Sequence, residues 1–170
     1  LFATASMVVP GPGIPLYNPA MKAAAGAGAD IAGDVELFAR ETKSKVLAIT
    51  GSNGKSTVTT LLGLMGKAAG IKTETGANIG VPVLSLLKDA PELAVLELSS
   101  FELETVKSLR AVGAVCLNVT EDHLDRYEGS LEKYGMAKHR IFRNALHIAA
   151  NREDKRSFPD YYAKETGVSP

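Results

Sequence analysis

The fold is decided by residues 46–57, which read Val46-Leu47-Ala48-Ile49-Thr50-Gly51-Ser52-Asn53-Gly54-Lys55-Ser56-Thr57. The stretch begins with apolar and β-branched residues, as a buried strand does. Glycine and small polar residues follow, and residues 58–65 then suit a helix. A strand, a small-residue loop and a helix N-terminus in this order bind phosphate, because free N–H groups and the positive end of the helix dipole face the anion.

We predict that this loop binds the phosphates of ATP. Lys55 would reach the terminal phosphates, and the Ser56 hydroxyl would coordinate Mg²⁺. Ile49 stands where the general phosphate-loop pattern has its first glycine, so the alternative is a glycine-rich turn with an exposed lysine. The predicted ATP-binding residues are Gly51, Ser52, Asn53, Gly54, Lys55, Ser56 and Thr57.

Outward from this loop, short apolar runs alternate with longer helical stretches, which is typical of parallel strands covered on both faces. Right-handed crossovers between such strands build a three-layer domain. We therefore predict an α/β fold with a mostly parallel sheet, plus a partial α/β piece at the N-terminus that includes a helix after Pro19. The expected strands are 46–50, 71–75, 93–98, 112–117 and 146–150, and the expected helices are 55–69, ending at Gly70, 82–88, 101–108 and 131–143, capped by Ser130.

The composition excludes several classes of function. Lys and Arg together number 19, as do Asp and Glu, so no net charge attracts nucleic acid or an anionic membrane. Hydrophobic residues make up 45% and charged residues 22%, which is the composition of a soluble domain rather than of a disordered tail. No apolar run approaches the length of a membrane-spanning helix. A single cysteine suits a reducing compartment, so the expected location is cytoplasmic.

Composition also divides the chain into three zones. Residues 1–41 are rich in Pro, Gly and Ala, residues 42–151 carry the regular strand–helix pattern, and residues 152–170 form a polar tail without clear periodicity. No basic segment precedes the first apolar residues, so a secretory signal is not expected. We expect the chain to be a piece of a longer protein.

Four further segments follow the phosphate loop: GANIG at 76–80, LELSSFELE at 96–104, NVTEDHLDR at 118–126 and AKHR at 137–140. With TGSNGKST at 50–57 they resemble, in type and order, the motifs of the ATP-dependent Mur ligases. The ELSSF string is most similar to the glutamate-adding branch of that family. The resemblance covers nearly all of residues 10–151.

The resemblance implies an ATP-dependent, amide-forming ligase of peptidoglycan synthesis, with a role in cell-wall biogenesis, cell shape and cell division. Such an enzyme transfers the γ-phosphoryl of ATP to the carboxylate of UDP-N-acetylmuramoyl-L-alanine, and the amine of D-glutamate then attacks the acyl phosphate. It acts as a monomer, without nucleic-acid or membrane partners. Residues 1–41 would be the remnant of a uridine-nucleotide-binding domain and residues 42–151 part of the central ATP-binding domain, with the C-terminal domain absent.

The resemblance further implies catalytic roles for Lys55, Glu97, His123 and Lys138. Glu97 would join Ser56 on a Mg²⁺ that bridges the β- and γ-phosphates. His123 would ligate a second Mg²⁺ and contact substrate. Lys138 would be carbamylated, which exchanges a cation for an anionic oxygen ligand. The implied metal ligands are thus Ser56, Glu97, His123 and, when carbamylated, Lys138.

From the residues alone, these positions have simpler interpretations. Glu97 could be a surface glutamate at the end of a strand, and His123 a solvated loop residue. Lys138 shares its predicted helix with Arg140 and Arg143, which favours an ordinary basic face. The acidic residues around His123 are interpreted as a solvated face in which Asp122 orients the imidazole; they are Glu121, Asp122 and Asp125.

The implied substrate-binding residues are Gly13, Asn78, Ser99 and His123. Asn78 could instead be a left-handed turn residue, and Ser99 could merely cap the following helix. Three positions depart from the family pattern: Gly11 where relatives often have Ser, Ala77 where Gly is common, and Glu102 where Gln is usual.

Other functions remain as alternatives. The chain could be an isolated ATP-binding module, or a nonproductive truncated product with exposed apolar surface. Among enzymes, a sister Mur ligase or a folylpolyglutamate synthase-like ligase shares the phosphate loop but fits ELSSF less well.

Overall fold

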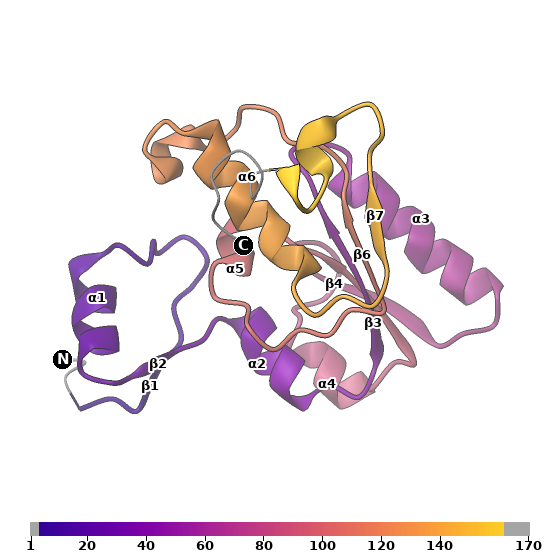
Figure 1. The fold of residues 1–170 in the computed structure, drawn as a ribbon. Coiled ribbons are helices and arrows are strands. Elements are labelled where there is room, and N and C mark those ends of the chain that lie inside the picture. The colour runs from indigo at the N-terminus through magenta and orange to yellow at the C-terminus, as the bar shows by residue number, and fades with distance from the viewer. Residues whose placement is uncertain (1–3, 162–170) are drawn as a thin grey trace.

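The computed structural model describes residues 4–161, in which a small N-terminal unit lies beside a larger α/β unit (Figure 1). Among these residues, the strands form a two-stranded and a five-stranded sheet. Residues 162–170 of the predicted polar tail lie outside this range. Within the described range, every helix is too short or too polar to cross a lipid bilayer.

The larger sheet consists of β3 (Lys45–Thr50), β4 (Thr73–Ala77), β5 (Leu93–Glu97), β6 (Gly113–Cys116) and β7 (Ile148–Ala150). Its order is β4-β5-β3-β6-β7, and every neighbouring pair is parallel. The predicted α/β fold with a parallel sheet is confirmed. β4 lies later in the chain than the predicted 71–75, because a turn through Gly70 leaves Ile71 exposed before the strand begins.

Helices cover both faces of the larger sheet (Figure 1). α3 (Lys55–Ala68) lies on one face, over β3, β4 and β5. α2 (Asp34–Glu41), α5 (Ser100–Leu103) and α6 (Leu131–His139) pack on the other face, where the main core buries Phe38, Leu96 and Tyr134. The short helix α4 (Ser85–Asp89) packs against β4, with Leu86 next to Gly76.

Glycine lets α3 approach the sheet closely. A Cβ atom at Gly63 would lie 2.6 Å from Cγ2 of Thr75, and one at Gly66 would lie 2.4 Å from Oγ1 of Thr73. Any larger residue at either position would push the helix away from β4. The close packing holds in place a helix whose first turn follows the phosphate loop directly.

The N-terminal unit pairs β1 (Met7–Val8) in parallel with β2 (Asp30–Ile31), and α1 (Pro19–Gly26) lies between them in the chain. The helix predicted after Pro19 is therefore confirmed. It starts where expected because the Asn18 side chain caps it, accepting a hydrogen bond from the Ala20 amide at 2.9 Å. Val8, Met21, Ala24 and Ala29 form a separate small core.

A buried carboxylate fastens α2, a helix that sequence analysis does not predict, to the loop before β6. Oε1 of Glu36 accepts hydrogen bonds from Nε of Arg40 (2.9 Å) and Oγ of Ser108 (2.7 Å). Its Oε2 accepts from the amides of Lys107 (2.7 Å) and Ser108 (2.8 Å). Burial raises the pKa of the Glu36 carboxyl, but the hydrogen bonds together outweigh burial and hold this pKa below its ordinary value.

Three predicted helices are shorter than expected, and the one predicted over 82–88 is α4, which begins only at Ser85. The helix predicted over 101–108 ends as α5 at Leu103, because the amides of Lys107 and Ser108 donate to Glu36 rather than to a preceding turn. The helix predicted over 131–143 is α6 followed by a 3-10 turn, Arg140–Phe142. Its predicted cap is confirmed, since Oγ of Ser130 accepts from the Lys133 amide at 3.1 Å.

Candidate functional site

The predicted site residues come together at the carboxyl edge of the larger sheet. From β3 the chain first runs toward β4 and β5, and later places β6 on the opposite side of β3. The loops after β3 and β6 therefore leave the sheet next to each other and diverge. Open α/β sheets bind ligands in the crevice at such a reversal of strand order.

The side chain of Lys55 forms hydrogen bonds with the backbone of the phosphate loop. Gly54 precedes α3 with φ +82°, a left-handed conformation that glycine adopts at little cost. Nζ of Lys55 lies 3.0 Å from the carbonyl oxygen of Gly51 and 3.1 Å from that of Ser52, so the ammonium group folds back over the loop. The first N–H groups of α3 have no partner within the helix and are available to an anion.

The loop after β6 clamps the tip of the phosphate loop. Oδ1 of Asn118 accepts from the Asn53 amide at 2.9 Å, and its Nδ2 donates to the Asn53 carbonyl at 3.1 Å. On the other side, Oη of Tyr134 lies 3.2 Å from Oγ of Ser52. Neither residue is among the site residues predicted from the sequence. Asn118 is the first residue of the NVTEDHLDR segment, and this position could have indicated a role in the site. For Tyr134 the sequence offers no such indication beyond its place in α6.

Glu97 ends β5 beside the phosphate loop, where its register partner is Ile49 of β3. The residue is 1% exposed, so it is not the surface glutamate of the simpler interpretation. Oε1 accepts from Nδ2 of Asn78 at 2.7 Å, but no described residue donates to Oε2, which is also buried. A buried carboxylate oxygen without a partner is costly unless a cation or water occupies it.

Asn78 therefore orients Glu97. The left-handed conformation considered for Asn78 is found one residue earlier, at Ala77, whose φ is +77°. A residue with a side chain is strained in that conformation, and this explains why glycine suits position 77.

Lys138 is buried in the same region, 1% exposed, so the basic helix face favoured by the residues alone is wrong. Nζ of Lys138 donates to the Gly51 carbonyl at 2.9 Å and lies 4.4 Å from the centre of the Tyr134 ring. Burial, and secondarily the charge of Lys55, lower the pKa of Lys138 to about 8. Two amines thus converge on the carbonyl of Gly51.

His123 lies on the outer side of the site, in a loop with φ +50°. Its Nε2 is 3.5 Å from Oδ2 of Asp122, the contact expected for an acid that orients the imidazole. Its ring packs 5.1 Å from the ring of Phe101, measured between centroids. The surrounding acids, Glu121, Asp122 and Asp125, are all exposed.

Ser99 caps α5, as one of its two interpretations proposes. Its Oγ accepts from the Glu102 amide at 3.2 Å, while Oε2 of Glu102 accepts from the Ser99 amide at 2.7 Å. Glu102, which replaces the usual glutamine, thus serves the capping box. Burial raises the pKa of the Glu102 carboxyl.

A cavity of about 210 Å³ brings together six of the predicted site residues. Cavities of about 220, 480 and 670 Å³ lie elsewhere among the described residues, and they are lined by other residues than the predicted site residues. Ser56, which is exposed, and Glu97 do not line it. Across residues 4–161, no three His, Cys, Asp or Glu side chains are grouped to hold a metal. The predicted residues that line the cavity are Gly13, Lys55, Asn78, Ser99, His123 and Lys138.

The donors at this edge fit a hard cation beside a phosphate chain. Mg²⁺ prefers oxygen ligands and completes its shell with water and phosphate oxygens. The open Oε2 of Glu97 and the exposed hydroxyl of Ser56 are such donors.

Comparisons with known proteins agree with this geometry. The family described as Mur ligase middle domain matches residues 49–168. UDP-N-acetylmuramoylalanine–D-glutamate ligase of Escherichia coli (strain K12) is 55% identical over 165 residues, which are 97% of this chain and 38% of that protein. The chain thus spans 38% of the length of the curated relatives it matches.

Solved structures share the fold. MurF from Acinetobacter baumannii is 25% identical with a TM-score of 0.58, over 75% of this chain and 31% of that one. MurF ligase from Thermotoga maritima, solved in complex with ADP, is 19% identical with a TM-score of 0.58, over 95% of this chain and 49% of that one. At this identity the likeness concerns the fold alone.

Proposed function

The chain belongs to the Mur ligase family, and on this premise we propose that it is the nucleotide-binding part of a ligase that adds D-glutamate to UDP-N-acetylmuramoyl-L-alanine. The observation that carries the proposal is the cavity beside the phosphate loop, which Lys55, Asn78, His123 and Lys138 line together. A phosphate loop alone would suit many nucleotide-binding proteins. The convergence of these side chains supports a reaction at the terminal phosphate.

ATP would bind with its phosphates in the loop of residues 51–57. The amides of the loop and of the first turn of α3 would donate to phosphate oxygens, and Lys55 would exchange its two carbonyl partners for the terminal phosphates. Asn118 and Tyr134 hold the loop in shape from both sides. A loop that is already shaped loses little conformational entropy on binding.

Two Mg²⁺ sites are proposed at this edge. Ser56 and Glu97 would hold one cation, and His123 with a carbamylated Lys138 would hold the other. When bound, Mg²⁺ neutralises charge that develops on the transferred phosphoryl group. Asn78 would keep the Glu97 carboxylate turned so that Oε2 stays open.

The proposed reaction makes an amide from a carboxylate, which is a poor electrophile. The γ-phosphoryl of ATP would pass to the carboxylate of UDP-N-acetylmuramoyl-L-alanine, ADP would leave, and the amine of D-glutamate would displace phosphate. Lys55 and the loop amides would stabilise the phosphoryl group in transit. Gly13, Asn78, Ser99 and His123 would contact the uridine-nucleotide substrate, because they line the cavity next to Lys55.

Carbamylation of Lys138 is supported by its burial beside the phosphate loop and by its neighbour Lys55. An anionic carbamate at this position would replace the repulsion between two ammonium groups by attraction. Carbon-13 NMR after equilibration with labelled bicarbonate would show one carbamate resonance that is lost in Lys138→Arg. A spectrum identical for both chains would contradict the modification.

The nucleotide site is tested by calorimetric titration of a non-hydrolysable ATP analogue with Mg²⁺. Lys55→Ala should weaken binding about 100-fold, since charge-assisted contacts to phosphate are the strongest in such sites. Lys67→Ala is the matched control, because Lys67 is an exposed lysine at the far end of the same helix. Equal affinities for Lys55→Ala and the unchanged chain would refute the site.

A nucleotide-binding module without ligase activity is the second candidate. The cavity of about 210 Å³ favours it, because sites for drug-sized ligands usually enclose at least about 300 Å³. Nucleotide binding and amide formation measured on the same chain separate the two candidates. The activity of a sister Mur ligase or of a folylpolyglutamate synthase-like enzyme is less well supported, because the relative that is 55% identical is named as a D-glutamate ligase.

We further propose that the protein is a cytoplasmic monomer without nucleic-acid or membrane partners. The zero net charge supports the lack of these partners, because no overall field attracts nucleic acid or an anionic membrane. Light scattering on the purified chain tests the monomer, and a mass of twice 17.9 kDa would contradict it.

A further inference from the structure

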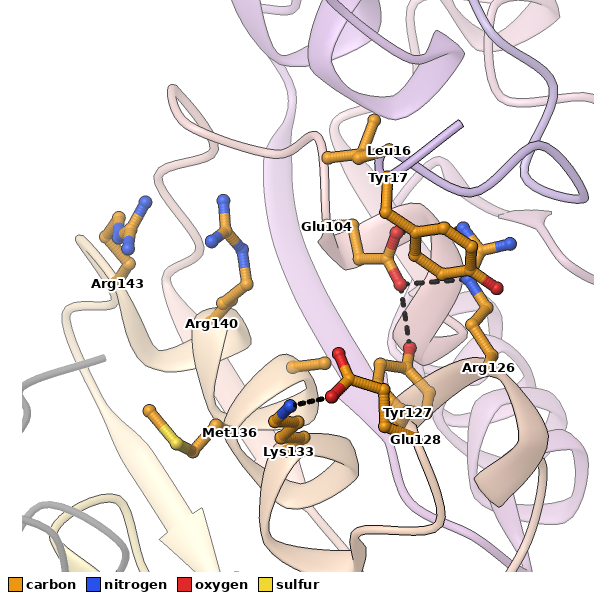
Figure 2. A pocket seen from close by; sticks show the side chains of 11 residues that line it. Leu16, Tyr17, Glu104, Arg126, Tyr127, Glu128, Lys133, Met136, Arg140 and Arg143 are labelled. Atoms are coloured by element: carbon orange, nitrogen blue, oxygen red, sulfur yellow. Dashed lines mark hydrogen bonds and ion pairs between the residues drawn. The ribbon is translucent and has the colours of Figure 1, made fainter. Parts of the chain in front are cut away.

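A second cavity, of about 480 Å³, lies between the N-terminal segment and α6 (Figure 2). It shares no lining residue with the cavity beside the phosphate loop. Its volume falls within the range of small-molecule sites. The proposed ligase reaction leaves this cavity without a role.

On one wall the charges are already neutralised. Nε and Nη2 of Arg126 donate to Oε1 and Oε2 of Glu104 at 3.0 and 2.8 Å, and Oη of Tyr127 donates to the same Oε1 at 3.0 Å. Below them, Lys133 pairs with Glu128 (Figure 2). These four charged groups therefore need no ligand.

The opposite wall holds two arginines that lack such partners. Nε of Arg140 donates to the Leu103 carbonyl at 2.7 Å and its Nη2 to the Val106 carbonyl at 3.4 Å, which fixes the guanidinium plane without neutralising it. Neither Arg140 nor Arg143 forms an ion pair with any described residue. Figure 2 shows both side chains extending in the same direction from the end of α6.

The electrostatics of this wall favour an anion. Glu104 also lines the cavity, but both of its carboxylate oxygens are occupied by Arg126 and Tyr127. Two uncompensated guanidinium groups side by side are the arrangement that binds carboxylate or phosphate through several donors.

The rest of the cavity is apolar. Met136 and Ala137 line it from α6, and Leu16 and Tyr17 line it from the N-terminal segment. Tyr17 is 55% exposed, so its ring can pack against a flat group.

We infer that this cavity binds a small organic anion, with its phosphate or carboxylate group on Arg140 and Arg143 and its apolar part between Tyr17 and Met136. The anionic end gives orientation, and the apolar end adds buried area that an inorganic ion lacks. The inference does not depend on the proposed ligase function, because it uses none of the residues assigned to that function.

Phenyl phosphate and benzoate, titrated into the full chain and followed by amide NMR shifts, test the inference. At least one of them should shift the amides of Tyr17 and Met136 saturably, and the tighter of the two identifies the anionic group. Because phosphate can also enter the phosphate loop, the amides of Gly54 and Lys55 are followed in parallel. Shifts confined to Gly54 and Lys55, or no saturable shift at all, would overturn the inference.

Variants test the contacts of the anionic end and of the apolar end of the ligand separately. Arg143→Gln should weaken binding of the tighter probe about tenfold, the loss expected for one charge-assisted contact. Arg110→Gln is the control, because Arg110 is an exposed arginine outside this cavity. Tyr17→Ala should weaken phenyl phosphate more than inorganic phosphate. Equal losses in Arg143→Gln and Arg110→Gln, with thermal melting unchanged, would contradict the assignment.

Discussion

Two buried glutamates lie at opposite edges of the larger sheet and differ in how their charge is satisfied. Glu36 is 0% exposed and Glu97 is 1% exposed, so the polypeptide removes both carboxylates from water. Both oxygens of Glu36 are occupied, by two side-chain and two backbone donors. At Glu97 only Oε1 has a donor from the described residues, Nδ2 of Asn78.

The difference separates a structural carboxylate from one that belongs to a site. Burial of a carboxylate costs several kcal/mol unless hydrogen bonds or cations offset it. At Glu36, hydrogen bonds from the protein itself offset the cost of burying the carboxylate. The same hydrogen bonds hold α2 against the loop before β6. At Glu97 one oxygen remains for a group that the polypeptide does not provide.

The largest effect is expected from removing the structural carboxylate. Glu36→Ala should lower the free energy of unfolding by about 3 kcal/mol, because Arg40 and the amides of Lys107 and Ser108 lose their partner together. Urea denaturation at neutral pH measures it. Glu41→Ala, at the exposed end of the same helix, is the control and should cost less than about 0.5 kcal/mol. Similar losses in both variants would mean that Glu36 is not the fastening group.

A smaller loss of free energy is expected from substituting Asn118. Its side-chain oxygen and nitrogen both form hydrogen bonds with the backbone of Asn53, so Asn118→Ala should loosen the phosphate loop. Affinity for the ATP analogue should fall about tenfold, equivalent to about 1.4 kcal/mol, while the melting temperature changes little. Unchanged affinity together with a lower melting temperature would make Asn118 a structural residue only.

The smallest effect is a pH dependence of the stability that Glu36 contributes. The folded-state pKa of Glu36 is lowered, so its ionised form stabilises the fold above the ordinary carboxyl pKa. That contribution is lost as pH falls through the folded-state pKa. The stability gap between the unchanged chain and Glu36→Gln should therefore be widest near pH 7 and narrow below about pH 4. A gap that stays constant or widens in acid would contradict the sign.

The phosphate loop and the parallel strands can be predicted from the sequence because local pattern determines them. Residues 46–57 specify a buried strand, a small-residue turn and a helix start within one short stretch. Contacts distant in sequence set what local pattern misses. The helix predicted over 101–108 ends early because Glu36, 71 residues before Lys107, takes its amide.

The site shows the same division. Lys138 looks like part of a basic helix face until the fold brings it to the carbonyl of Gly51, 87 residues earlier. The open Oε2 of Glu97 depends on Asn78 and on the packing around β5, which no local pattern encodes. For α2, by contrast, a signal exists, since Val35 and Phe38 are one helical turn apart and both buried.

The most direct measurement is the Mg²⁺ dependence of binding of the non-hydrolysable ATP analogue to the unchanged chain and to Glu97→Gln. If Oε2 of Glu97 receives the cation, Mg²⁺ should tighten binding to the unchanged chain about tenfold more than to Glu97→Gln, a difference of about 1.4 kcal/mol. Affinities without Mg²⁺ should be the same, and exposed Glu121→Gln should behave as the unchanged chain. Full Mg²⁺ enhancement in Glu97→Gln would contradict the assignment.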